Sequence, residues 1–517
     1  MTSYEEEAER APRVGAGLVK RGLLAMVLVV AMSATAVATT VVLEIDDVKN
    51  AFLGEGRAQF DIPEVTEAEA GGPRTILILG SDARYEDRKL GVKPRSDTIL
   101  LVRANPRKQA VALMSIPRDL LVEIPGRGSN KINDAYERGG PRLTVRAVKK
   151  LFEDATGEDF PINNVINVNF GTFRRAVDYI GGVYIDVDRD YFNDKSAGVG
   201  AGYAKIDVDP GYQKLRGQDA LDYVRYRLGD NDFIRAARQQ DFLRQVRGQA
   251  GVRKLVSVSD RQRLARVFGR YFEVDKSFRE TKQIFSMLRL GLYLIQESPR
   301  VNEVRFRADE AANPALDSRL YASRQQLRQT FDEFMNAQGS AKPRQTAAPT
   351  QADKESARVR RRANRNRRAA VAGLEQARAQ GVDQAVLADP KLDFPFYFPE
   401  LRTVGAAYAG DRPRTYGLND ERGKRHEAYR LVVSKGLIGE YYGVQGTTWK
   451  DPPILDDPDE TRMVNGRRLL LFRDGERLRL VGWKTGRGTY WVSNTLSQSL
   501  NRRQMLAIAE SLTRLKQ

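Results

Sequence analysis

The chain has 517 residues, a formal net charge of +18, no cysteine and one histidine, His426. This length calls for more than one hydrophobic core, and the composition excludes thiol nucleophiles, disulfides, Cys/His zinc sites and most Ser-His-Asp hydrolases. The charge favours anionic partners such as nucleic acid, phospholipid headgroups or phosphate-bearing polymers. His426 lies among charged residues and is predicted to be on the surface.

An uncharged, largely apolar run at residues 22–43 is long enough to cross a hydrocarbon core of about 30 Å as one helix. Lys20 and Arg21 precede the run, and Glu44 and Asp46 follow it. The positive-inside rule therefore places residues 1–21 in the cytoplasm and nearly everything else outside. We predict a single-pass protein of the cell membrane. A cleaved signal peptide is the alternative, although its apolar core is usually shorter.

Residues 44–73 are polar and acidic and are predicted to form a stalk, and an ordered domain follows at 74–336. Short apolar runs at 75–79, 98–102 and 111–114 predict strands that are buried on both faces. Helices and strands then alternate along the chain. The predicted elements are helix 141–157, strand 165–168, helix 172–179, strand 183–187, helices 218–227, 232–247, 261–272, 280–296 and 323–335, and a strand at 304–306.

This alternation predicts an α/β fold in which helices sandwich a central, mostly β-sheet core. Asp230 or Asp232 is the expected N-cap of the helix at 232–247. Residues 337–392 are rich in arginine and poor in large apolar residues, which predicts a low-complexity linker. Aromatic residues return at 393–517, where strands and a final helix at 502–512 predict a small α+β domain.

Four turns rich in Asp and Arg recur in the main domain. Carboxylates hold a hard divalent cation through oxygen, and guanidinium groups match phosphate oxygens in pairs. The combination therefore predicts a site for a metal-bridged pyrophosphate. The residues concerned are Asp82, Arg84, Arg95, Asp97, Arg118, Asp119, Arg225, Arg227, Arg235, Arg238 and Gln239.

Each motif also has a purely structural interpretation. The turns at Asp82 and Asp97 are explained by side chains that bond their own backbone, and Arg118 with Asp119 by a local ion pair. Asn133 and Asp134 are interpreted as part of a loop cap. We prefer a binding site because several arginines near two aspartates would repel one another unless an anion lay between them.

The ordered strings ILGSDAR, RSDTILL, SIPRDL, KINDAY, VRYR and RAARQQ resemble the LytR-CpsA-Psr family of membrane-anchored cell-wall glycopolymer ligases over about residues 74–335. The resemblance implies transfer of a glycopolymer from a polyprenyl-pyrophosphate carrier to peptidoglycan, assisted by magnesium or manganese. It also implies contact with membrane lipid. The domain at 393–517 is not the usual companion domain of this family.

Carried over residue by residue, the resemblance assigns the metal to Asp82 and Asp97, and catalysis to Asp97, Arg118 and Asp119. Either Asp97 or Asp119 is the candidate base. The phosphates are assigned to Arg84, Arg95, Arg118, Arg225, Arg227, Arg235, Arg238 and Gln239.

Three alternatives remain open from the residues. A pyrophosphatase would use nearly the same side chains with water as the attacking group, and a non-catalytic module would bind phosphate-bearing wall polymers without turnover. A DNA-binding regulator would suit the net charge. It is disfavoured because the basic motifs are predicted to lie outside the cytoplasm and no helix-turn-helix is evident. We therefore predict no nucleic-acid partner.

Overall fold

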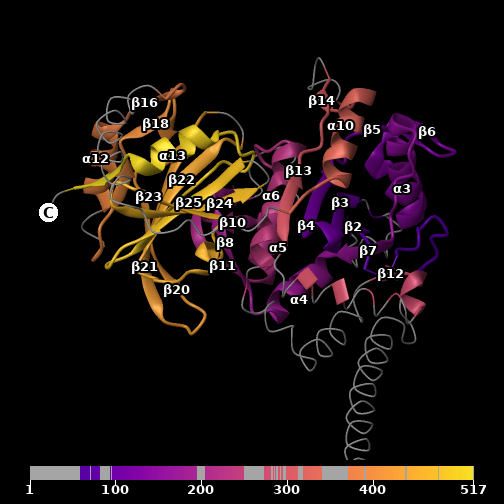
Figure 1. Cartoon of the computed structure of the whole chain (residues 1–517), viewed down its shortest axis with the longest axis horizontal. Helices are drawn as coiled ribbons and strands as arrows, with labels where there is room; N and C mark the ends of the chain where they lie inside the picture. Colours follow the sequence, from indigo (N-terminus) through magenta and orange to yellow (C-terminus); the bar gives the residue numbers. More distant parts are fainter. Residues whose placement is uncertain are drawn as a thin grey trace, which may run out of the picture.

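Two domains lie side by side in the computed structural model (Figure 1). The predicted cytoplasmic segment 1–21, the predicted span 22–43 and most of the predicted stalk lie outside the described residues. Among the helices formed by the residues described, none combines the length and apolarity needed to cross a membrane. The structure describes residues 59–69, 71–81, 94, 96–194, 204–247, 249, 273–280, 283, 286, 289–290, 293–294, 299–311, 318–339, 371–388, 392–436, 439–474 and 477–515.

A seven-stranded mixed sheet forms the centre of the first domain. In spatial order its strands are β1 (Gln59–Phe60), β12 (Glu273–Asp275), β7 (Asn164–Asn169), β2 (Arg74–Ser81), β3 (Ser96–Asn105), β4 (Ala110–Ile116) and β13 (Arg300–Val304). The strands predicted at 75–79, 98–102, 111–114 and 165–168 are thereby confirmed. The strand predicted at 304–306 lies earlier in the chain than expected: β13 begins at Arg300 and ends at Val304.

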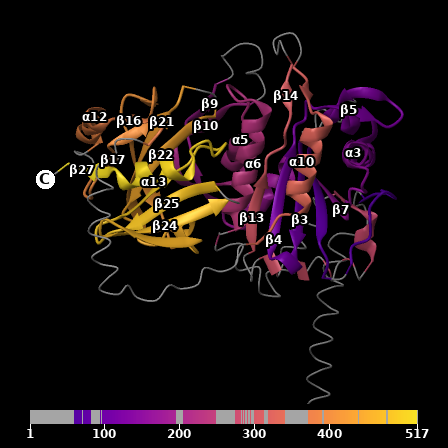
Figure 2. The same cartoon turned by 45° about the horizontal axis from the view of Figure 1, so that its top comes forward.

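Helices cover both faces of this sheet, as predicted. Leu77 and Leu101 face a core shared with α3 (Ile132–Thr156) and α10 (Arg324–Met335). Alternate residues such as Ile76 face the opposite way, toward Leu243 of α6 (Asp232–Arg247). Figures 1 and 2 show α6 between the sheet and the C-terminal domain, and α3 and α10 on the other side. The period-two alternation of the strands thus sorts their side chains between two helical layers.

Helix α3 begins earlier than predicted. Asn133 and Asp134 lie in its first turn, so the loop-cap interpretation was wrong. The backbone leaves helical geometry at Gly140 (φ 61°, ψ −156°), and a second helical segment starts at Pro141, where the prediction began. Proline is tolerated there because its missing N–H belongs to a first turn. The helix ends at Gly157 as expected.

The remaining helices of this domain follow the predicted order. They are α4 (Phe170–Tyr179), α5 (Gly217–Arg225) and α6, and strand β8 (Val183–Val187) pairs with β11 (Gly211–Leu215). The N-cap of α6 was predicted to be Asp230 or Asp232, which was wrong. The N-cap is Asn231, which lies between them, because its Oδ1 accepts the Ile234 N–H at 3.0 Å. The helix predicted at 261–272 lies outside the described residues, as does most of the one at 280–296. Short strands complete the domain: β5 (Leu121–Ile124), β6 (Gly128–Lys131), β9 (Tyr191–Asn193), β10 (Ile206–Val208), β14 (Asp309–Glu310) and β15 (Leu320–Tyr321).

The C-terminal domain is built on an eight-stranded antiparallel sheet. Its strands are β19 (Ala407–Tyr408), β20 (Arg414–Asn419), β21 (Arg425–Ser434), β22 (Tyr441–Thr447), β26 (Thr489–Ser493), β25 (Arg477–Lys484), β24 (Arg467–Asp474) and β23 (Glu460–Val464). Helix α13 (Arg502–Glu510) packs on its core. Two short antiparallel strand pairs belong to the same domain: β16 (Leu374–Gln376) with β18 (Leu401–Thr403), and β17 (Tyr397–Pro399) with β27 (Leu512–Arg514).

Two predictions about this region need correction. The linker was extended too far, because β16 and α12 (Arg378–Ala388) belong to the domain and Ala385 is buried in its core. His426 is not a surface residue: its side chain is 8% exposed, its Nε2 lies 3.0 Å from Asp420 Oδ2, and its ring stacks on Trp449. A charged sequence neighbourhood did not indicate exposure, because alternate residues of a strand point to opposite faces.

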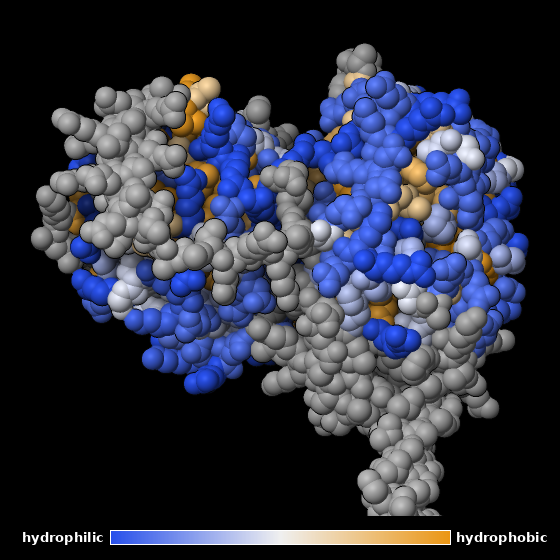
Figure 3. Space-filling model, viewed as in Figure 1, coloured by the Kyte–Doolittle hydropathy of each residue, from blue (hydrophilic) through white to orange (hydrophobic). Residues whose placement is uncertain are grey.

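The two domains share a buried interface. Tyr184 and Tyr212 of the first domain pack with Trp449 and Trp491 of the second. Arg430 pairs with Asp186 at 2.9 Å, although both side chains are almost fully buried. The coloured surface of both domains is largely hydrophilic in Figure 3. The domains are therefore joined by a packed contact as well as by the chain itself.

Candidate active site

Asp97 lies at the centre of the candidate site. It is the second residue of β3, and Arg118 follows the end of the antiparallel neighbour β4. This pairing brings both residues to one edge of the sheet, where Arg118 Nη1 lies 2.8 Å from Asp97 Oδ1. Arg227, between α5 and α6, pairs with Asp97 Oδ2. Burial raises the pKa of Asp97, but the charges of Arg227 and Arg118 outweigh it and leave the pKa lowered.

Arg118 is surrounded by carboxylates. Its Nε lies 3.4 Å from Asp119 Oδ2 and 3.8 Å from Asp232 Oδ1. Burial lowers the pKa of Arg118, but Asp232 and Asp97 outweigh that effect and leave it raised. Lys131 binds the other oxygen of Asp119 at 2.8 Å. The guanidinium therefore stays charged and fixed in orientation at the edge of the sheet.

Helix α6 closes one side of the site. Arg235 pairs with Asp232 one turn earlier at 2.7 Å and is 8% exposed. Burial is the largest effect on Arg235 and lowers its pKa, against the opposing charge of Asp232. Gln239 donates to Thr98 Oγ1 at 3.1 Å and to the carbonyl oxygen of Val224 at 3.2 Å. These contacts attach α6 to β3 beside Asp97.

A polar cavity of about 510 Å³ opens at this edge of the sheet. Arginine side chains lie at one part of its wall, and amide and acidic side chains from β6 and α3 form another. Such a wall suits a ligand that carries both phosphate and hydroxyl groups. The cavity is lined by Asp97, Arg118, Asp119, Asn130, Lys131, Asn133, Asp134, Glu137 and Arg227.

Three arginines that were predicted to contact phosphate, Arg225, Arg235 and Arg238, do not line this cavity, and neither does Gln239. Arg238 is fully buried, pairs with Asp230, and lies against the rings of Tyr191 and Tyr226. Arg225 pairs with Asp222 at 2.5 Å and contacts the ring of Phe170. In this structure the side chains of Arg225 and Arg238 support the helices around the site and do not face the cavity.

Contrary to the expectation from the sequence, carboxylates of the protein itself neutralise the arginines around the site. The arginines do not require an anion to come together, because Asp97, Asp119, Asp222, Asp230 and Asp232 balance them. Three of these aspartates were missed as functional neighbours. The spacing of Asp222 with Arg225 and of Asp232 with Arg235, three residues apart on a helix, was the signal available.

The remaining predicted residues, Asp82, Arg84 and Arg95, lie outside the described residues. Within the described part of the chain, no group of three or more His, Asp or Glu side chains is arranged to hold a metal. Asp97 supplies the hard oxygen ligands that magnesium prefers, but both its oxygens are engaged by arginines. A metal at Asp97 would therefore need a partner ligand such as Asp82.

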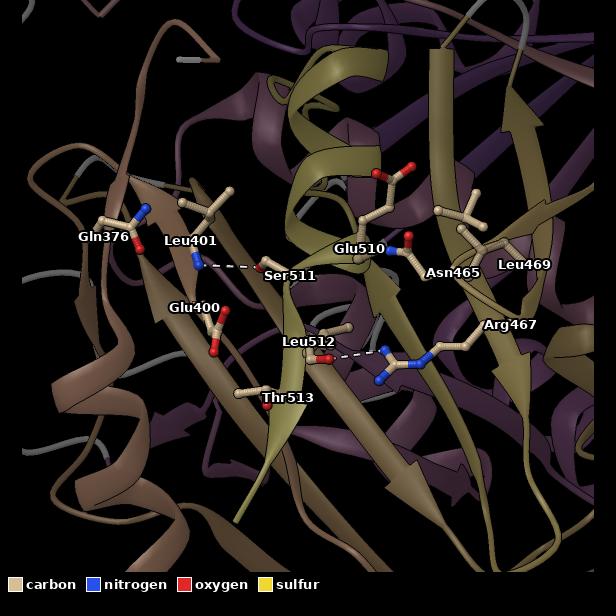
Figure 4. Close-up of a pocket in the computed structure, with 12 residues that line it drawn as sticks. Gln376, Glu400, Leu401, Asn465, Arg467, Leu469, Glu510, Ser511, Leu512 and Thr513 are labelled. Carbon is tan, nitrogen blue, oxygen red and sulfur yellow. Dashed lines mark hydrogen bonds between the residues drawn. The ribbon is translucent and has the colours of Figure 1, made fainter. Parts of the chain in front are cut away.

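A second cavity, of about 340 Å³, lies in the C-terminal domain (Figure 4). Arg467 donates to the carbonyl oxygen of Leu512 at 2.9 Å on one side, and Ser511 accepts the Leu401 N–H at 3.2 Å on the other. Glu400 and Glu510 also line it. None of the predicted site residues does.

The family model described as "LytR_cpsA_psr family" matches residues 28–334. The chain is 28% identical over 241 residues to "Polyisoprenyl-teichoic acid--peptidoglycan teichoic acid transferase TagT" of Bacillus subtilis (strain 168), which is 46% of this chain and 72% of that protein. It is 37% identical over 177 residues to the transferase TagU of Bacillus cereus (strain AH820). That match covers 34% of this chain and 52% of the TagU protein.

Solved structures were also matched. The structure named "TagT bound to LIIa-WTA" covers 55% of this chain and 97% of its own, with 24% identity and a TM-score of 0.39. A "LytR-Csp2A-Psr enzyme from Actinomyces oris" covers 55% and 99%, with 17% identity and a TM-score of 0.40. The C-terminal domain at 371–515 lies outside the range of the family model. Because that model spans more than half of the 517 residues, the chain belongs to the LytR-CpsA-Psr family.

Proposed function

We propose that this protein transfers a glycopolymer, as a glycosyl phosphate, from a polyprenyl-pyrophosphate carrier to a hydroxyl of peptidoglycan and releases polyprenyl phosphate. Family membership supports this class of reaction, and so do relatives whose names describe teichoic acid transfer to peptidoglycan. The observation that carries the proposal is the pair of arginines, Arg118 and Arg227, on the two oxygens of Asp97 beside a polar cavity.

The two guanidiniums are suited to exchange a carboxylate for a phosphate. Both anions accept parallel N–H groups from a guanidinium fork, and charge-assisted bonds to either are short and directional. A pyrophosphate entering the cavity would therefore take over bonds that Asp97 now accepts. Lys131 and Arg235 add positive charge beside it.

In the proposed step, a peptidoglycan hydroxyl oxygen attacks the phosphorus that carries the sugar. A new P–O bond forms, the bond from that phosphorus to the bridging oxygen breaks, and polyprenyl phosphate leaves with the bonding electrons. The arginines stabilise charge on the transferring group, which is the main requirement of phosphoryl transfer. We assign the hydroxyl proton to Asp119, the other candidate base that lines the cavity, because Asp97 is a poor proton acceptor. Burial raises the pKa of Asp97, but its two arginine partners outweigh burial and leave the pKa lowered.

We propose that magnesium or manganese is held by Asp97 together with Asp82, where it would neutralise pyrophosphate charge. We also propose a single-pass location in the cell membrane, with the N-terminus in the cytoplasm and the catalytic domain outside. The apolar run at 22–43 and its flanking charges support this location. The partners are then the lipid-linked glycan, peptidoglycan and membrane lipid, with no nucleic acid.

The test incubates the purified full chain in detergent with a polyprenyl-pyrophosphate saccharide, a peptidoglycan oligomer and magnesium. We expect polyprenyl phosphate and glycan-linked peptidoglycan in equal amounts. Polyprenyl phosphate without linked glycan would indicate a pyrophosphatase. If neither product forms, the protein would have only a binding role. The Arg118→Ala variant should lose both products, whereas Arg107→Ala, which removes an exposed ion pair with Glu69, should keep them.

A further inference from the structure

The C-terminal domain contacts the helix that closes the site. Arg244, near the end of α6, pairs with Glu303 of β13 and lies 3.0 Å from Asp474 of the C-terminal domain. Asp474 ends strand β24 and also accepts the Glu303 N–H at 2.8 Å. Gln498 of the same domain donates to Asp474 at 2.5 Å. One carboxylate of the C-terminal domain thus joins α6 to the edge strand of the central sheet.

This cluster is buried. The side chains of Arg244, Glu303 and Asp474 are 10%, 8% and 4% exposed, and Asp241 of α6 adds a further carboxylate 3.0 Å from Arg244. Burial raises the pKa of Glu303 well above its ordinary value, although the charge of Arg244 opposes this effect. A raised pKa favours the neutral form of Glu303, which reduces its repulsion from the nearby carboxylate of Asp474. Buried ion pairs of this kind resist small shifts, because an unpaired charge in the interior is costly.

A second route runs through strand β8. Gln245 of α6 accepts the backbone N–H of Asp186 at 3.0 Å, and the Asp186 side chain binds Arg430 at 2.9 Å and the Trp491 indole N–H at 3.2 Å. Arg430 and Trp491 both belong to the C-terminal sheet. The last two turns of α6 are therefore held by the C-terminal domain on two sides.

The opposite end of the same helix forms part of the candidate site. Asp232 faces Arg118 at 3.8 Å and Arg235 at 2.7 Å. Arg235 and Arg244 are nine residues apart, which corresponds to about 13 Å along an α-helix. A helix transmits a displacement along its axis because its backbone hydrogen bonds move as a unit.

We infer that Asp474 is a positioning residue: through Arg244 and Glu303, the C-terminal domain holds α6 where Asp232 lies between Arg118 and Arg235. The domain at 371–515 is then a structural support of the site and not a separate module on a tether. The inference rests on the proposed function only for its effect on ligand binding. Its effect on α6 itself is independent of any ligand.

The test compares the full chain with the Asp474→Asn variant, which keeps the size of the side chain and removes its charge. Amide hydrogen exchange should rise in residues 232–239 by roughly two- to thirtyfold, the range for coupling through a packed network. Binding of inorganic pyrophosphate, measured by calorimetry, should weaken by a similar factor. The control is Glu375→Gln, which breaks an ion pair with Arg402 elsewhere in the C-terminal domain.

The Asp474→Glu variant keeps the charge and guards against a failure of Asp474→Asn to fold. It should restore most of the protection in residues 232–239, a rescue that a loss of packing alone would not produce. Unchanged exchange at 232–239 in a folded Asp474→Asn protein would overturn the inference, as would equal changes in Glu375→Gln. Failure of the unaltered protein to bind pyrophosphate would count against the proposed function, and the exchange measurement would still decide the role of Asp474.

Discussion

Arg118 Nη1 lies 2.8 Å from Asp97 Oδ1, although the two residues are 21 positions apart in the chain. The antiparallel pairing of β3 with β4 accounts for this contact, because it places the start of one strand beside the end of the other. A strand pairing thus builds the centre of the candidate site. Residues near in sequence, such as Arg225 and Arg227, have different roles.

The first prediction separates these two arginines. Arg227→Ala should lower the rate of polyprenyl phosphate release by about 10² to 10³, the usual loss when one donor to a charged transition state is removed. Arg225→Ala should lower the rate by less than about tenfold, since Arg225 pairs with Asp222 outside the cavity. Steady-state kinetics on both variants is the measurement, and equal losses would contradict the cavity assignment.

The second prediction concerns stability at acid pH. The pKa of Asp97 is lowered in the folded protein, chiefly by the charges of Arg227 and Arg118 acting against burial. Its ion pairs are therefore fully stabilising above the unfolded value of about 3.9 and are lost as pH falls through the folded pKa. Urea unfolding from pH 6 downward should show the stability gap between the unaltered protein and Asp97→Asn shrinking below about pH 4. Parallel curves would refute the assigned shift.

The third prediction concerns Arg238, which was expected from the sequence to bind phosphate. Arg238→Met should lower the free energy of unfolding by about 3 kcal/mol, because it breaks a buried ion pair with Asp230. This value is the low end of the usual range, since Arg189 still binds Asp230 in the variant. Urea unfolding measures this change. Arg142→Met, which removes an exposed pair with Glu64, should cost no more than about 1 kcal/mol. A similar small loss in Arg238→Met would mean that the buried pair is not structural.

The fourth prediction tests the domain interface. Gly211 has φ +112°, and a Cβ there would lie 2.6 Å from the Tyr416 Oη and 3.1 Å from the Arg430 Cβ. Gly211→Ala should lower the thermal unfolding temperature more than Gly126→Ala does, because Gly126 also has a positive φ, of +74°, but nothing lies within 4 Å of its Cβ position. The control measures the cost of a positive φ without a steric conflict, and equal shifts would argue against the packed interface.

Much of the main domain was predictable because local patterns specify local structure. The apolar runs that became β2, β3 and β4 are continuous, as buried strands require, and the boundary at Gly157 follows from a glycine that ends a helix. The predictions failed where a side chain's surroundings come from distant residues. His426 is buried by Trp449, and Asp230 is used by Arg238 and Arg189 instead of capping α6.

The sequence by itself determined the family, most strands and helices of the main domain, and four residues that line the cavity, Asp97, Arg118, Asp119 and Arg227. Only the tertiary structure decided which of the predicted arginines face the cavity, which carboxylates neutralise them, and how the C-terminal domain is attached. The physical reason is that periodicity and turn chemistry act over a few residues, whereas the pairing of Asp186 with Arg430 joins groups 244 positions apart. Such pairs exist only after the sheet, the helices and the two domains have packed.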